Sequence, residues 1–289
     1  MIIQNSTGLI TSGEAFNKCR SYSRYVNVED FTELQNMYSV KLCDSLRFEE
    51  AIEVTKKTCE YEELLHTIKE EINPSETKYI HQGRTYSQLA QCYSFIGDYE
   101  NASKNFLKAF ECYGDDGFNR TITMSYYLHM LIEQRNLDEY EKYVKEYLGQ
   151  ETLKEQLLDI LSIDNISSMF KLYVYMKALY VFYVDDMKDN SPNLLKELLS
   201  KVEGIKKITN KNNHPWEMIY KYAAFCCLKV GNKEYNDKAE EYINLAKTSL
   251  VNVDDGVLQK IIDEIDIQCN SVKEGRNAFE DSKLTYMYR

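Results

Sequence analysis

The sequence predicts an all-α protein whose helices come in antiparallel pairs. The chain has only three prolines and eleven glycines in 289 residues, which is too few turn residues for a β-rich protein of this length. Each proline stands where a helix would begin, as in Asn73-Pro74 and Ser191-Pro192, and none interrupts an apolar period. Nearly every long segment can therefore be helical.

Residues 83–116 give the clearest helix pair. The apolar face of its first helix recurs at i, i+3, i+4 and i+7 and comprises Tyr86, Leu89, Ala90 and Tyr93. Gly97-Asp98 breaks this pattern, and a second apolar face follows with Ala102, Phe106, Ala109 and Phe110. Ala90 and Ala102 are small where the two helices should cross, so the backbones can approach closely. A short turn between two such helices predicts an αα-hairpin.

This segment resembles the tetratricopeptide repeat, a 34-residue helix-turn-helix unit. The resemblance rests on Tyr86, Leu89-Ala90, Tyr93, Gly97-Asp98-Tyr99, Ala102, Phe106 and Ala109. It departs from the repeat at Gly114, where the family usually has a proline. The resemblance implies a tetratricopeptide-like α-solenoid of antiparallel helix pairs that forms a right-handed superhelix.

Weaker helix pairs are predicted along the rest of the chain. They cover residues 31–65, 121–148, 166–184 with 192–208, and 216–250, and residues 257–269 with the last fifteen cap the array. Their turns recur about every 40 to 50 residues, close to the periods of solenoids. The predicted organisation is an N-terminal segment over residues 1–30, repeats over 31–184, and further repeats with capping helices over 185–289.

Composition and charge restrict the compartment and the partners. The chain carries 46 acidic and 35 basic residues, a net charge of −11, and this acidic balance disfavours nucleic acid. The N-terminus has no cationic signal region, and the most apolar stretch, residues 178–184, is far too short to span a membrane. Eight scattered cysteines without a CxxC pair are typical of buried thiols in a reducing compartment. We therefore expect a cytoplasmic protein with no membrane partner.

The sequence contains no motif that indicates a catalytic residue, a cofactor site or a metal site. Phosphate loops, GxSxG and HExxH are absent from the sequence. The four histidines lie far apart, and none has a second ligand at i+3 or i+4. Cys226 and Cys227 are adjacent, so on a helix their side chains point about 100° apart and do not share one metal easily. The sequence favours a non-enzyme.

The resemblance to tetratricopeptide repeats implies a partner groove lined by the first helix of each pair. Carried over to this sequence, the groove positions of the clearest unit are Arg84, Ser87, Gln88 and Gln91. Comparable positions in the later units are Tyr126, Met130, Glu133, Lys221 and Phe225. The family's peptide-carboxylate clamp is not matched, because Gln88 stands at its asparagine position.

The resulting hypothesis is a non-catalytic scaffold or adaptor that binds a protein or peptide, and self-association is left open. The alternative is a peptide-sensing intracellular regulator that resembles bacterial receptors built from the same repeat. Those receptors usually carry an N-terminal helix-turn-helix or effector bundle, for which residues 1–30 are too short. An enzyme with an unconventional helical site is the third alternative.

Overall fold

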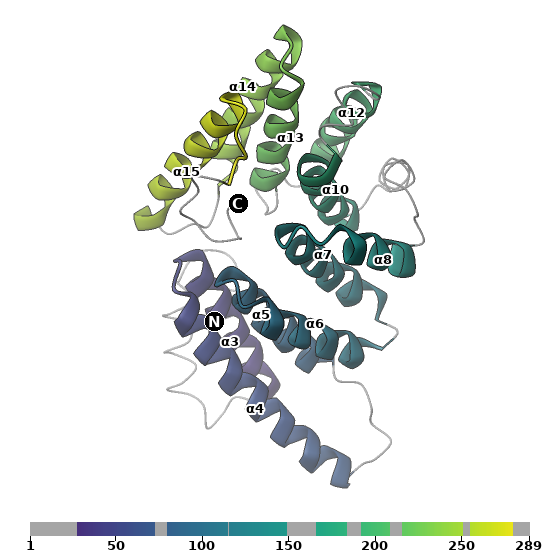
Figure 1. Ribbon diagram of the computed structural model, residues 1–289. Helices are drawn as coiled ribbons and strands as arrows, with labels where there is room; N and C mark the ends of the chain where they lie inside the picture. Colours follow the sequence, from purple (N-terminus) through teal and green to yellow (C-terminus); the bar gives the residue numbers. More distant parts are fainter. Residues whose placement is uncertain are drawn as a thin grey trace. The chain divides into compact units, whose positions relative to one another are not determined.

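The computed structural model describes residues 28–72, 80–114, 116–148, 166–183, 192–208, 216–250 and 255–279. Throughout these ranges the chain forms helices joined by turns (Figure 1). The prediction of an all-α protein is thus confirmed for the part of the chain that the structure describes. Nearly all of the predicted N-terminal segment, residues 1–30, lies outside it.

The chain divides into two compact units, Met1–Thr123 and Met124–Arg289, which we call the first unit and the second unit. This division falls inside α7 (Gly117–Glu133). The domain boundary expected from the sequence, at residues 184 and 185, lies within the second unit and stays a prediction. Each unit is described by itself below.

The first unit holds two successive helix pairs. α3 (Val28–Asp44) packs against α4 (Phe48–Ile72), and α5 (Ile80–Phe95) packs against α6 (Tyr99–Tyr113). α3 also lies against α5, so the first helices of the two pairs are neighbours. Polar side chains take part in this contact, since Asn36 Nδ2 donates to Thr85 Oγ1 at 2.8 Å.

The α5–α6 pair follows the predicted pattern closely. Every residue assigned from the sequence to its two apolar faces is buried, and Ala90 and Ala102 are completely so. The turn lies at Gly97, whose φ of 79° is in the left-handed region that glycine adopts without strain. Local sequence alone therefore accounts for this hairpin.

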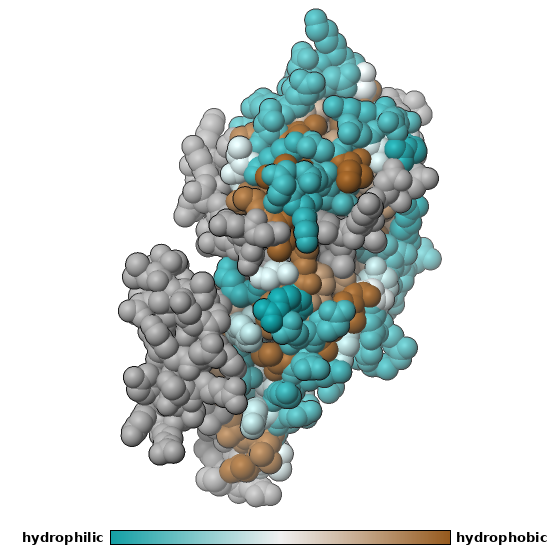
Figure 2. Space-filling model, turned by 90° about the vertical axis from the view of Figure 1, so that its left-hand side faces the viewer, coloured by the Kyte–Doolittle hydropathy of each residue, from teal (hydrophilic) through white to brown (hydrophobic). Residues whose placement is uncertain are grey.

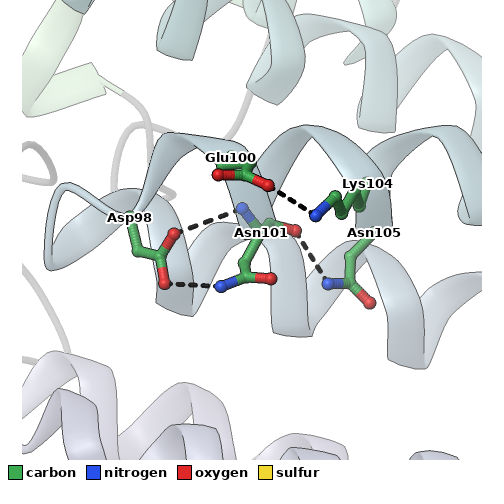
Figure 3. A network of polar contacts seen from close by, with 5 residues as sticks. All are labelled: Asp98, Glu100, Asn101, Lys104 and Asn105. Atoms are coloured by element: carbon green, nitrogen blue, oxygen red, sulfur yellow. Dashed lines mark hydrogen bonds and ion pairs between the residues drawn. The ribbon is translucent and has the colours of Figure 1, made fainter.

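The N-terminus of α6 is held by a capping network around Asp98 (Figure 3). One carboxylate oxygen of Asp98 accepts from the backbone N–H of Asn101 at 3.2 Å, and the other accepts from Asn101 Nδ2 at 2.7 Å. Glu100 and Lys104 form an exposed ion pair at 2.6 Å, one turn apart. An acidic cap satisfies the first free N–H groups of a helix and complements its dipole, so this network fixes where α6 begins.

Besides its buried face, α4 has exposed apolar side chains in its C-terminal half. Tyr61, Leu64 and Ile68 are 55%, 60% and 45% exposed. Their spacing of three and four residues places them on one side of the helix. Figure 2 shows hydrophobic surface at the lower end of the view, the level at which α4 ends in Figure 1. The outer side of α4 is therefore partly apolar.

Gly83 lies where α5 approaches the end of α6 most closely. A Cβ at this position would come within 2.6 Å of Tyr113 Cε1 and 3.1 Å of Cys112 Cβ. We expect Gly83→Ala to lower the free energy of unfolding by about 1–2 kcal/mol, because overpacking exceeds the helix propensity that alanine adds. Urea denaturation measures this loss.

The matched control for Gly83 is Gly204, within α12 (Pro192–Ile208), where an added Cβ would meet nothing within 4 Å. Gly204→Ala should leave stability unchanged or raise it by up to about 1 kcal/mol. Equal stability of Gly83→Ala and the wild type would contradict the close approach of α5 and α6.

The second unit contains the end of α7 and the later helices. These are α8 (Leu137–Leu148), α10 (Ile166–Ala178), the π-helical turn η1 (Leu179–Tyr183), α12, α13 (Trp216–Val230), α14 (Lys233–Thr248) and α15 (Asp255–Lys273). The turns between paired helices lie at Arg135 and Gly231, both with positive φ. The π-helical turn was not predicted, since the sequence indicated an ordinary helix there.

α13 is the central helix of the second unit. It pairs with α14, and α10 and α15 also pack against it. Its first twelve residues, Trp216 to Cys227, are all buried. A helix that is covered on every side carries its polar residues into the interior as well, and in α13 these include Glu217 and Lys221.

Candidate functional site

Two of the predicted groove residues of α5 reach the surface. Arg84 is exposed, and its Nε donates to Asn119 Oδ1 at 3.1 Å. Gln91 is half-buried, and its Nε2 donates to the backbone carbonyl of Ser87 at 3.3 Å. They lie seven residues apart, which is two turns of helix, so they share one side of α5.

The other two predicted residues of α5 contact neighbouring helices. Ser87 is buried and accepts a hydrogen bond from Thr123 Oγ1 at 3.0 Å. Gln88 is half-buried, and its Nε2 donates to Ser39 Oγ of α3 at 3.4 Å. Partner contact by these residues stays a prediction, and Ser87 in particular has little surface to offer.

The predicted residues of the second unit are mostly interior. Met130 and Lys221 are 0% and 1% exposed, while Tyr126 is half-buried. Burial, and then the charge of Glu217, raise the pKa of Tyr126 to about 12. These side chains line the inside of the unit, and their contact with a partner also stays a prediction.

Three buried charged residues come together in the second unit, and we call them the lysine cluster. Glu133 comes from α7, Lys177 from α10 and Lys221 from α13. Lys177 Nζ lies 2.5 Å from Glu133 Oε1, and their side chains are 0% and 5% exposed. Burying two ammonium groups is costly unless carboxylates compensate them.

Lys177 was not among the residues predicted from the sequence, although a signal for it exists. It is the one charged residue in the run LYVYMKALYVFY, residues 172–183, and Lys221 stands in a similar run, YKYAAFCC. A helix that buries such a run on all sides must bury the lysine too. A single lysine within an apolar helix is therefore the pattern that would have revealed both.

Aromatic rings surround the ammonium groups of the lysine cluster. The Tyr222 ring centroid lies 5.6 Å from Lys177 Nζ and 5.3 Å from Lys221 Nζ. Phe225 lies 6.0 Å from Lys221 Nζ. Cation–π contacts of this kind contribute about 0.5–2 kcal/mol each, so the rings replace part of the water that the lysines lose.

Lys221 binds its proton less tightly than an ordinary lysine does. Burial, and next the positive charge of Lys177, lower the pKa of Lys221 to about 7. Glu133, Cys269 and Glu264 act in the opposite direction but do not restore its ordinary value. Lys221 therefore gains or loses its proton near neutral pH, although only 1% of the residue is exposed.

α15 and the residues after it cover this side of α13. Glu264 and Cys269, which influence Lys221, both belong to α15 and are buried. The backbone N–H of Ala278 donates to the hydroxyl of Tyr180 at 3.0 Å, and the Phe279 ring lies 6.4 Å from the Tyr222 ring. The C-terminal helix expected from the sequence as a cap thus packs over the face that holds Lys221.

A buried carboxyl lies in the first unit. Glu62 of α4 is 5% exposed, and burial raises its pKa to about 7 against the opposing influence of Thr85 and Thr32. It is an ionisable group whose charged form is disfavoured by its surroundings. The contribution of Glu62 to stability decreases as the pH rises, whereas that of Lys221 increases. Experiments on the pH dependence of stability must separate the two contributions.

Within the described ranges, no three His, Cys, Asp or Glu side chains gather as metal ligands would. None of the described helices combines the length and apolar character of a membrane span. Comparison of the chain with known protein families, with curated proteins and with solved structures finds no significant match.

Proposed function

We propose that this chain is a non-catalytic helical-repeat protein that binds a protein or peptide partner, with the polar side of α5 as its contact surface. The observation that carries the proposal is the stacking of two hairpins in the first unit, with the first helices α3 and α5 side by side. Stacked hairpins of this kind form extended binding surfaces in repeat proteins.

The exposed residues of α5 suit this role chemically. Arg84 presents an exposed guanidinium, which can bind a carboxylate through two parallel hydrogen bonds. Gln91, on the same side, adds an amide that both donates and accepts. Arginine is enriched among the residues that dominate protein interfaces. An acidic or polar segment of a partner would fit this surface.

Affinity capture from native lysate tests the proposal. We expect the wild type to retain a stoichiometric partner, and the Arg84→Ala/Gln91→Ala variant to retain at least ten times less. The control variant Glu100→Ala/Lys104→Ala removes the exposed ion pair of α6 instead and should bind as the wild type does. A partner held equally by all three proteins would contradict the role of α5.

The second candidate function is a peptide-responsive regulator, and the lysine cluster supports it. Buried ionisable groups with shifted pKa values concentrate at functional sites, and burial lowers the pKa of Lys221 to about 7 beside the ion pair of Lys177 and Glu133. The positive charge of the two ammonium groups would attract an anionic group of a peptide. To enter, it must displace part of α15 or the segment that ends at Phe279.

Small-angle scattering with and without a pool of short peptides tests this second candidate. A change of the radius of gyration with free-carboxylate peptides, but not with their C-terminal amides, would support carboxylate recognition. Identical scattering with both pools would remove the support for peptide sensing.

A further inference from the structure

Two thiols from neighbouring hairpins meet inside the first unit. Cys43 belongs to α3 and Cys92 to α5, and their Sγ atoms lie 3.6 Å apart. The residues are 2% and 0% exposed. A disulfide has an S–S distance of about 2.05 Å, so the two sulfur atoms need to approach by only about 1.5 Å to form one.

Polar groups surround this pair of thiols. Ser39 Oγ lies 3.6 Å from Cys92 Sγ, and Gln88 Nε2 lies 3.6 Å from Cys92 Sγ and 3.9 Å from Cys43 Sγ. The hydrogen bond with Cys43 is the largest influence on Cys92. Together with those from Ser39 and Gln88, it lowers the pKa of Cys92 against the effect of burial.

The other buried thiols behave differently. Burial raises the pKa of Cys269 to about 12 and that of Cys227 to about 12, and it raises the pKa of Cys59 and Cys226 as well. The thiolate is the reactive form of cysteine, so the lowered pKa of Cys92 distinguishes it from these residues. Cys92 also has a second thiol, that of Cys43, in contact.

We propose that Cys43 and Cys92 form a redox modification site, which a peroxide converts to an intramolecular disulfide that joins α3 to α5. The Cys92 thiolate attacks one peroxide oxygen, the O–O bond breaks, and the products are a sulfenic acid and, after protonation of the leaving hydroxide, water. Cys43 then attacks the sulfenic sulfur, and the departing hydroxide takes the Cys43 proton as a second water. Two thiols are oxidised and one hydrogen peroxide is reduced to two waters.

The disulfide would connect the two hairpins of the first unit directly. In a reducing compartment the pair stays a dithiol until an oxidant appears, and its burial admits only a small oxidant during local opening of the helices. The bond closes a loop of about fifty residues, which removes conformational freedom from the unfolded chain. Formation of the disulfide also changes the contacts that Gln88 Nε2 makes with the two sulfur atoms. Gln88 belongs to the predicted partner surface.

Peptide mapping of the full chain tests the proposal. Trypsin cuts after Lys41, Arg47, Arg84 and Lys104, so Cys43 and Cys92 fall on separate fragments, 42–47 and 85–104, with one cysteine each. After exposure of the folded protein to hydrogen peroxide and alkylation of free thiols, we expect these fragments linked, with the loss of two hydrogen atoms. Dithiothreitol should separate them, and the Tm should be roughly 5–10 °C higher before reduction than after it.

Cys43→Ser and Cys92→Ser should each abolish the linked fragment and the change in Tm. The control Cys269→Ser removes a buried thiol of the second unit and should keep both. The proposal would be overturned if the folded wild type, after peroxide treatment, gave no linked fragment of 42–47 with 85–104. It would also be overturned if the Tm of Cys43→Ser changed on reduction as much as that of the wild type. Mapping of the wild type requires no variant, so a serine variant that fails to fold leaves the test intact.

Discussion

Replacement of Glu133 by glutamine is expected to lower the free energy of unfolding of the second unit by about 3–5 kcal/mol. The carboxylate lies 2.5 Å from Lys177 Nζ, and both side chains are almost completely buried. Without the negative charge, Lys177 loses this ion pair and stays in the interior beside Lys221. Urea denaturation followed by circular dichroism measures the loss.

Two further variants separate the charge effect from a general effect of substitution. Glu146→Gln changes an exposed glutamate of α8 and should alter stability by no more than about 0.5 kcal/mol. Glu133→Gln combined with Lys177→Met removes both charges and should recover much of the loss. If the single variant is as stable as the wild type, the ion pair does not hold α7 to α10.

Replacement of Lys221 by methionine is expected to raise the free energy of unfolding by about 1–4 kcal/mol at pH 7, because methionine fills a similar volume without a charge to bury. The effect also depends on pH. The pKa of Lys221 is lowered from 10.5 to about 7 in the folded protein, so the unfolded chain binds more protons between these values. Stability from this group is fully present above pH 10.5 and is lost progressively as the pH falls from 10.5 to about 7.

The wild type should therefore gain stability relative to Lys221→Met as the pH rises above 7, by up to about 1.4 kcal/mol per pH unit. Denaturation of both proteins at pH 7 and pH 8 measures this difference. Groups that the two proteins share contribute equally to both profiles and cancel in the difference. Glu62 is one of them: because its pKa is raised to about 7, its contribution to stability decreases as the pH rises from 4.5 to 7. Lys260→Met, on the exposed side of α15, is the control. Parallel pH profiles of wild type and Lys221→Met would contradict the burial of a charged Lys221.

Apart from the π-helical turn η1, the described helices and their turns could be predicted from the sequence because their causes are local. The α5–α6 hairpin needed only the apolar spacing on each helix, two alanines at the crossing and a glycine with positive φ at position 97. The start of α12 at Pro192 and the turn at Gly231 depend on equally local rules. The superhelix expected from the resemblance depends on how successive pairs stack, which local patterns do not determine, and it stays a prediction.

A single lysine within an apolar run indicates that the lysine is buried, but the sequence does not show which groups meet in the lysine cluster or in the thiol pair, because contacts between distant segments bring them together. Glu133 and Lys221 were candidates only by their place in the repeat pattern, and neither was expected to be buried. Their surroundings depend on the packing of α10 and α15 against α13. Cys43 and Cys92 are 49 residues apart, and only the contact of α3 with α5 brings their sulfur atoms together.

Hydrogen exchange of the first unit tests the central claim, which is that a partner binds the polar side of α5. The partner captured by the wild type would be added back to the purified chain, and amide exchange would be followed for each helix. The proposal predicts slower exchange in α5 and the adjoining α3, with α6 unchanged. Slower exchange confined to α4 or α6, with α5 unaffected, would contradict it.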